Sequence, residues 1–343
     1  MQLKAYRWVE MSRISIMVVL VLVSNVLLAR KLLPEIERAM SSGAEAKICL
    51  KISDDMGFPI ADASVCVVFD MTPRPTSVYG KTDTNGVCVI QGKTNGNSIS
   101  FLVGKNGYYG GEQKISYVPM GAERAVKDGK WQPYGEELTL VLKPIKNPIK
   151  LKSVPVKEFL FTSSVCEWVG YDIEKNDFIK PNGSGEIADF EVYLDWDKIY
   201  SINDSKQIGF KIRFIEEGAG FYVQPLDQMS KLPTPYFAET NRVFVKEAQF
   251  YGRYNGKRLK QRFDESQCWI IRSRCKFDDN GKLKVAHYSV VRFLGVSASP
   301  ELKVGFCFLG AFNPMPNDTN LEDIEAVETS RQFIRYCEPK KSK

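Results

Sequence analysis

The chain has 343 residues, of which 44% are apolar and 26% charged, and its formal net charge is +6. This composition is that of ordinary globular domains and excludes disordered, collagen-like and multispan membrane proteins. Most of the positive excess lies near the N-terminus and in the C-terminal tail. Because no concentrated basic face remains, we do not expect the protein to bind nucleic acid. The single histidine, His287, argues against His-rich metal sites.

A mostly apolar run without charged residues at 14–29 follows a basic stretch and ends at Arg30 and Lys31. As a helix it would cover roughly 24 Å, close to the thickness of the hydrocarbon core. We predict a retained signal anchor, and a cleaved signal peptide is the alternative. The basic residues before the run outweigh those after it, which predicts that the bulk of the chain lies outside the cytoplasm, in a periplasmic or extracellular position.

Eight cysteines are present, and none belongs to a Cys-x-x-Cys pair. This spacing argues against zinc ribbons and iron–sulfur clusters. Most of the cysteines lie in strand-like apolar runs, where a free cysteine packs as a small apolar side chain. One or two disulfides are the alternative in an exported protein. We expect no metal and no cofactor.

After an N-terminal segment that ends in a connecting helix (residues 1–45), residues 46–145 are expected to form a first β-domain. Residues 46–52 alternate between apolar and polar with the period of a half-buried strand. Asn85-Gly86 fits a type I′ turn, with the next strand beginning at Val87. The other strand-like runs, at the spacing of a β-sandwich, are 63–69, 98–103, 105–109 and 137–142.

This region also carries a family resemblance. The segment 55–65 (Asp-Met-Gly-Phe-Pro-Ile-Ala-Asp-Ala-Ser-Val), Thr82-Asp83-x-Asn85-Gly86 and Lys105-x-Gly107-Tyr108 together resemble the carboxypeptidase regulatory-like, transthyretin-like β-sandwich of bacterial envelope proteins. The resemblance covers residues 46–145. It implies a module that serves as a spacer or in adhesion or docking, and it implies no catalytic residues.

A proline-broken stretch at residues 146–154 predicts an extended linker. Residues 155–340 are expected to form a second all-β domain, a sandwich or jelly roll, with a short helix within 320–335. We recognise no family for this part. Asn255-Gly256 and Asp279–Gly281 predict hairpins. The clearest alternating runs are 190–196, 208–214, 285–294 and 304–308. The fold class is therefore all-β, with a transmembrane helix followed by two β-sandwich-like domains.

Acidic residues flank Trp196 in a way that could suggest a glycosidase. Glu191, Asp195 and Asp197 supply the carboxylates that such an enzyme requires as a pair. On a strand, however, the three share one face, which is typical of a solvated sheet surface. We therefore assign no catalytic residue.

Four aromatic residues in predicted loops are candidates for partner binding: Tyr108, Tyr109, Trp131 and Tyr134. Exposed aromatic rings provide a large contact area at low entropic cost. The alternative for Trp131 is that it folds back over a sheet edge. The sequence predicts a membrane-anchored, non-enzymatic envelope protein whose β-domains bind or position a protein or glycan. An exported carbohydrate-active enzyme or a carbohydrate-binding module in the second domain is the alternative.

Overall fold

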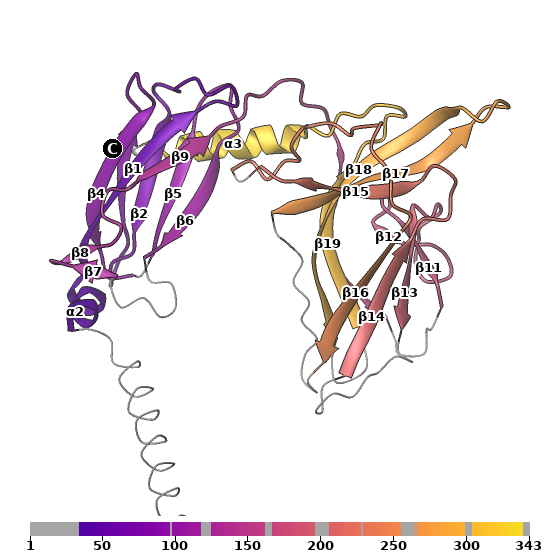
Figure 1. The fold of residues 1–343 in the computed structure, drawn as a ribbon, viewed down its shortest axis with the longest axis horizontal. Helices are drawn as coiled ribbons and strands as arrows, with labels where there is room; N and C mark the ends of the chain where they lie inside the picture. The colour runs from indigo at the N-terminus through magenta and orange to yellow at the C-terminus, as the bar shows by residue number, and fades with distance from the viewer. Residues whose placement is uncertain are drawn as a thin grey trace, which may run out of the picture. The chain divides into compact units, whose positions relative to one another are not determined.

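The computed structural model describes residues 34–96, 98–117, 125–161, 167–195, 206–227, 229–254, 264, 266–298 and 304–338. The described chain consists mostly of β-strands with two helices, α2 (Pro34–Ser42) and α3 (Ile324–Tyr336), so the all-β prediction is confirmed (Figure 1). The expected anchor at residues 14–29 lies outside the described residues. Within the described part of the chain, neither helix is long and apolar enough to span a bilayer.

The chain divides into two compact units. Unit 1 contains the chain up to Lys143 and takes in the C-terminal segment from Arg331, and unit 2 contains Pro144–Ser330. The boundary therefore passes through α3. The sequence predicts this helix wholly within the second domain. The difference arises because periodicity gives the extent of a helix and not the surface that it covers.

Two sheets form unit 1. The first, called the β1 sheet, has the order β4 (Val87–Thr94), β1 (Ala44–Ser53), β8 (Lys130–Trp131) and β7 (Val126–Lys127), with β9 (Glu137–Val141) paired parallel to β1. The second, called the β2 sheet, has the order β3 (Thr76–Lys81), β2 (Ser64–Phe69), β5 (Ser98–Gly104) and β6 (Gly111–Ser116).

The core of unit 1 follows from the alternation along its strands. On β1, Ile48, Leu50 and Ile52 are buried, while the residues between them are partly or fully exposed. On β2 both faces are covered. The outward-facing Cys66 is buried because the end of α3 lies there, with Cys337 Sγ 3.4 Å from the carbonyl oxygen of Leu102, the register partner of Cys66 on β5.

The turn at Asn85-Gly86 differs from the prediction. Only Gly86 adopts positive φ (+76°), and its N–H donates to the carbonyl of Asp83, so the turn is a type I turn followed by a left-handed glycine and not a type I′ turn. The Asp83 carboxylate fixes it by accepting the N–H groups of Asn85 and Val87. The turn does not close a hairpin, because β3 and β4 belong to different sheets.

Unit 2 also has two sheets, both antiparallel. The first, called the β18 sheet, has the order β10 (Lys152–Phe161), β19 (Val304–Phe312), β18 (Leu283–Ala298), β17 (Gln267–Phe277) and β15 (Gly220–Pro225). The second, called the β13 sheet, has the order β12 (Asp177–Phe178), β11 (Val169–Asp172), β13 (Phe190–Asp195), β14 (Lys206–Arg213) and β16 (Glu247–Tyr254).

Aromatic side chains from both sheets fill the core of unit 2. Tyr171 of the β13 sheet packs edge-on against Phe308 of the β18 sheet, with ring centroids 5.1 Å apart. Phe221 and Trp269 stack at 3.7 Å. Burial of each such side chain contributes about 1.5–3 kcal/mol.

The predicted hairpin at Asp279–Gly281 is present between β17 and β18, with Gly281 at φ +74°. The predicted helix within 320–335 begins later, at Ile324, because Leu321 is buried in the chain that precedes it. The six cysteines whose side chains the structure describes are unbridged, and five of them are buried.

Candidate functional site

Two of the four predicted partner-binding aromatics are not on the surface. Tyr109 and Trp131 have no exposed side-chain area. The Trp131 indole donates from Nε1 to the carbonyl of Thr94 at 3.0 Å, and its ring stacks on Tyr117 at a centroid distance of 5.7 Å. The expectation that these two rings are exposed was wrong, because β8 places Trp131 beside β1 and the apolar ring is covered there.

The other two aromatics, Tyr108 and Tyr134, are half-buried. The Tyr134 hydroxyl donates to Glu45 Oε2 at 3.3 Å, and Lys130 Nζ lies 5.0 Å from the centre of its ring. Partner binding at Tyr108 and Tyr134 stays a prediction. The four residues do not form one exposed cluster, since two of them belong to the core.

The acidic residues around Trp196 are described only in part. Trp196 and Asp197 lie outside the described residues, and so does the side chain of Asp195. Glu191 lies on the outer face of β13, where its Oε2 accepts Arg213 Nε at 2.7 Å.

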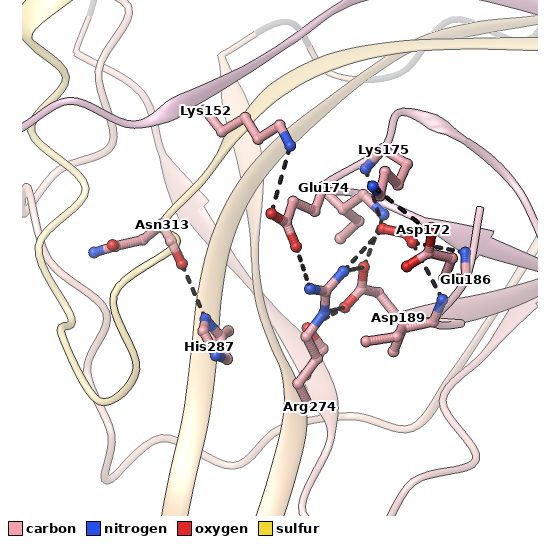
Figure 2. A network of polar contacts seen from close by, with 12 residues as sticks. Lys152, Asp172, Glu174, Lys175, Glu186, Asp189, Arg274, His287 and Asn313 are labelled. Carbon is pink, nitrogen blue, oxygen red and sulfur yellow. Dashed lines mark hydrogen bonds and ion pairs between the residues drawn. The ribbon is translucent and has the colours of Figure 1, made fainter. Parts of the chain in front are cut away.

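A group of charged side chains in unit 2 surrounds Arg274, which lies on β17 at a register irregularity and has φ +54° (Figure 2). Its guanidinium is paired with three carboxylates. Nη2 lies 2.8 Å from Asp172, Nε lies 2.9 Å from Asp189, and Nη1 contacts Glu174. Because Asp172 ends β11 and Asp189 precedes β13, these contacts join the two sheets of unit 2.

Every oxygen of the two buried carboxylates accepts two donors. For Asp172, the N–H groups of Lys175, Glu186 and Ile187 supply the donors other than Arg274. For Asp189, they are the Ser273 hydroxyl at 2.7 Å and the Ile173 N–H at 2.7 Å. The Glu174 carboxylate also accepts Lys152 Nζ at 3.4 Å.

The protonation of this group follows from its contacts. Burial favours the neutral form of Asp172, but backbone N–H donors and Arg274 outweigh burial, so its pKa lies below the ordinary value. The pKa of Glu174 is lowered in the same way, by Arg274 and Lys152 against burial. Asp189 has no exposed side-chain area, and its burial raises its pKa even though Arg274 opposes this effect.

This arrangement is suited to holding structure together and not to proton transfer. A general acid or base must reach a substrate atom with an available proton or lone pair. The oxygens of Asp172 and Asp189 are already engaged by internal donors. We therefore call Arg274, Asp172, Glu174 and Asp189 the Arg274 clamp. No sequence motif identified it, and the one available signal was a charged residue inside the buried run of β17.

His287 lies on β18 beside this clamp. Its Nδ1 is 3.2 Å from the carbonyl oxygen of Asn313, which can only accept, so Nδ1 carries the proton. The imidazole ring stacks on Phe312 at 5.4 Å and an interplanar angle of 11°. The ring is therefore positioned by this packing and by its contact with Asn313.

The outer face of the β13 sheet gathers aromatic and charged side chains. The Arg213 guanidinium lies 3.9 Å over the ring of Trp168 while its Nε donates to Glu191. The rings of Trp168 and Tyr193 are 5.3 Å apart, and Lys211 Nζ lies 5.4 Å from the centre of the Tyr193 ring. We call these five residues the β13 outer row.

In the part of the chain that the structure describes, no group of three or more His, Cys, Asp and Glu side chains is arranged to hold a metal ion.

Comparison with protein-family models gives no match, and comparison with curated protein sequences gives none. Solved structures that match in part include 3-chlorocatechol 1,2-dioxygenase from Rhodococcus opacus 1CP, at 12% identity and a TM-score of 0.24, over 30% of this chain and 61% of that one. A DUF3823 family protein from Parabacteroides merdae matches at 8% identity and a TM-score of 0.19, over 79% of this chain and 96% of that one.

A streptococcal ancillary pilin matches at 10% identity and a TM-score of 0.20, over 61% of this chain and 58% of that one. The chain spans about three fifths or less of the length of the dioxygenases that it matches. At these TM-scores the likenesses carry no inference about function.

Proposed function

We propose that the protein is a non-enzymatic, membrane-anchored envelope protein whose two β-units lie outside the cytoplasm and bind or position a protein or glycan partner. The observation that carries this proposal is where the charged side chains of unit 2 lie and which groups they contact. In the interior, Asp172 and Asp189 are engaged by Arg274 in the Arg274 clamp. Those on the outer face stand beside aromatic rings on a sheet surface.

We further propose that residues 46–145, within unit 1 up to Lys143, form a carboxypeptidase regulatory-like domain. Support comes from the motif that suggested the resemblance. Its three turn glycines, Gly57, Gly86 and Gly107, all adopt positive φ, at +86°, +76° and +83°. Left-handed backbone favours glycine, so these motif positions have a local physical reason.

The anchor and orientation rest on the apolar run at 14–29 and on the basic residues before it. The test is protease treatment of intact spheroplasts that produce the full chain with a C-terminal epitope. We expect the epitope and unit 2 to be digested while a cytoplasmic marker protein stays intact. Full protection of unit 2 until the membrane is lysed would overturn the orientation.

A matched variant tests the anchor separately. Replacing residues 14–29 by a cleavable signal peptide should move the protein from the carbonate-washed membrane fraction to the soluble fraction. Retention of this variant on the membrane would contradict the role of residues 14–29.

A further inference from the structure

We propose that the β13 outer row is a glycan-binding site at which a sugar chain lies across the strands of the β13 sheet. The inference deepens the proposed function and rests on it. It assigns the stacking surface to Trp168 and Tyr193 and the hydrogen-bonding groups to Glu191, Lys211 and Arg213.

The backbone register places these side chains together. Glu191 pairs with Arg213 and Tyr193 pairs with Lys211 between β13 and β14. The residues that alternate with them, Val192 and Ile212, are each 1% exposed and point into the core. Because successive side chains of a strand point to opposite faces, the members of the row on β13 and β14 share the outer face.

Arg213 is held in position before any ligand arrives. Its guanidinium lies over the Trp168 ring, with Cζ 3.9 Å from the ring centroid, and its Nε donates to Glu191 at 2.7 Å. The hydrogen bond to Glu191 uses Nε of Arg213. In the contacts between described residues, the two Nη groups of Arg213 stay available as donors. The Arg213 side chain is 33% exposed and that of Glu191 is 15% exposed, so the pair is fixed and still borders solvent.

The chemistry of the row matches that of a sugar. A pyranose ring has an apolar C–H face, which stacks on aromatic rings, and hydroxyl groups at its edge, which hydrogen-bond to planar charged side chains. Arg213 covers one face of the Trp168 ring. Lys211 Nζ in turn lies over the Tyr193 ring. The sugar is therefore assigned to the remaining surfaces of the two rings, with its hydroxyls at Arg213 and Glu191.

Other occupants fit this surface less well. The cores of protein–protein interfaces are depleted in Lys and Glu, whereas here Lys211 and Glu191 lie beside the aromatic rings and their arginine. A nucleic acid requires a surface of positive charge. The acidic Glu191 belongs to the row, and Glu247 faces Arg213 from β16.

The test uses the full chain in detergent and a panel of oligosaccharides of glucose, N-acetylglucosamine, mannose and uronic acids, with binding measured by titration calorimetry. We expect at least one member to bind, and Trp168→Ala and Tyr193→Ala each to weaken it at least tenfold. Arg213→Ala should weaken it by a similar factor. The control is Tyr336→Ala, which removes a 66% exposed aromatic side chain from α3 and should leave binding unchanged.

The melting temperature of each variant shows whether it folds. If Trp168→Ala does not fold, Tyr193→Leu keeps an apolar side chain without a ring and gives the same comparison. No binding to any member of the panel would overturn the inference, and so would binding that persists in the Trp168 and Tyr193 variants. Binding of DNA or lipid vesicles instead of glycans would also overturn it.

The protease experiment on spheroplasts separates this inference from the proposed function. An external chain that binds no sugar retains its proposed anchor and position and loses only the glycan site. A cytoplasmic chain that binds sugar through Trp168 and Tyr193 retains the glycan site and loses the proposed location.

Discussion

Units 1 and 2 are both built from two sheets, but different polar groups tie each one together. In unit 1 the buried contacts are neutral. The Thr82 hydroxyl donates to the Ile60 carbonyl at 2.7 Å and accepts the Ala63 N–H at 2.8 Å. In unit 2 the corresponding contacts are ionic and centre on Arg274. Similar architectures therefore rest on interactions that respond differently to mutation and to pH.

The physical difference lies in what remains when one partner is lost. Loss of a neutral hydrogen bond leaves an unsatisfied group that costs about 1–3 kcal/mol. Loss of one partner of a buried ion pair leaves an uncompensated charge, which costs about 3–5 kcal/mol. Unit 2 is therefore more sensitive to a single substitution than unit 1.

The largest expected effect is that of Arg274→Met, which preserves much of the side-chain volume but removes the charge. It leaves Asp172 and Asp189 buried without a cation and should destabilise unit 2 by about 3–5 kcal/mol. Hydrogen exchange should rise in the peptides of β11, β13 and β17 and stay unchanged in unit 1.

The control for Arg274 is Arg242→Ala. Arg242 pairs with Glu239 at 2.6 Å, but its side chain is 57% exposed. Exposed ion pairs contribute about 0–1 kcal/mol, so this variant should behave nearly as the wild type. Equal effects of the two substitutions would contradict the structural importance of the Arg274 clamp.

A smaller effect is expected in unit 1, where two glycines can be compared. Gly57 and Gly86 both have positive φ, which costs an alanine about 1–2 kcal/mol. A Cβ at Gly57 would meet no atom within 4 Å, whereas at Gly86 it would lie 2.3 Å from the Ile52 carbonyl oxygen. Denaturant unfolding should show Gly86→Ala to be the more destabilising. Equal losses would mean that backbone conformation alone governs both sites.

The smallest expected effect concerns acid. The pKa values of Asp172 and Glu174 are lowered in the folded protein, so the stability they contribute is present above their unfolded pKa values, near 4, and is lost as pH falls further. Asp189, whose pKa is raised by burial, acts in the opposite sense and reduces the net effect. Unit 2 should become susceptible to pepsin at a higher pH than unit 1.

Alkali should not distinguish the units in this way. Burial raises the pKa of Cys88 in unit 1 to about 11 and that of Cys268 in unit 2 to about 12. Both groups therefore contribute stability that is complete below about pH 9 and is lost above it. In the acid experiment, pepsin susceptibility of both units at the same pH would contradict the prediction that the ionic contacts of unit 2 make it less stable to acid.

Strands whose residues alternate were predictable from the sequence. The run 46–52 alternates because one face of the strand is buried and the other is partly or fully exposed, and the described side chains of the run 208–214, from Phe210 to Phe214, follow the same pattern. Strand β17 was missed, because Cys268–Ile271 are all buried and show no alternation. The turn at Gly86 was located correctly, but its type depends on which sheets the flanking strands join, which no local pattern encodes.

The Arg274 clamp could not be predicted for a related reason. Asp189 and Asp172 lie 85 and 102 residues from Arg274 along the chain, so their proximity is a product of the fold. The expected exposure of Tyr109 and Trp131 is wrong for a different reason. The composition of the loop around Trp131 suggested exposure, but a large apolar ring next to a sheet edge is more stable when it covers that edge.

The division of α3 between the units affects the order in which the protein can fold during its synthesis. The outer face of the β2 sheet, around Cys66 and Leu102, is covered by residues that leave the ribosome after all of unit 2. At about 5–20 residues per second, the interval between Lys143 and Arg331 is on the order of ten to forty seconds. During that time the outer face of the β2 sheet in a nascent unit 1 is not yet covered. It becomes covered only when the last turns of α3 have been synthesised.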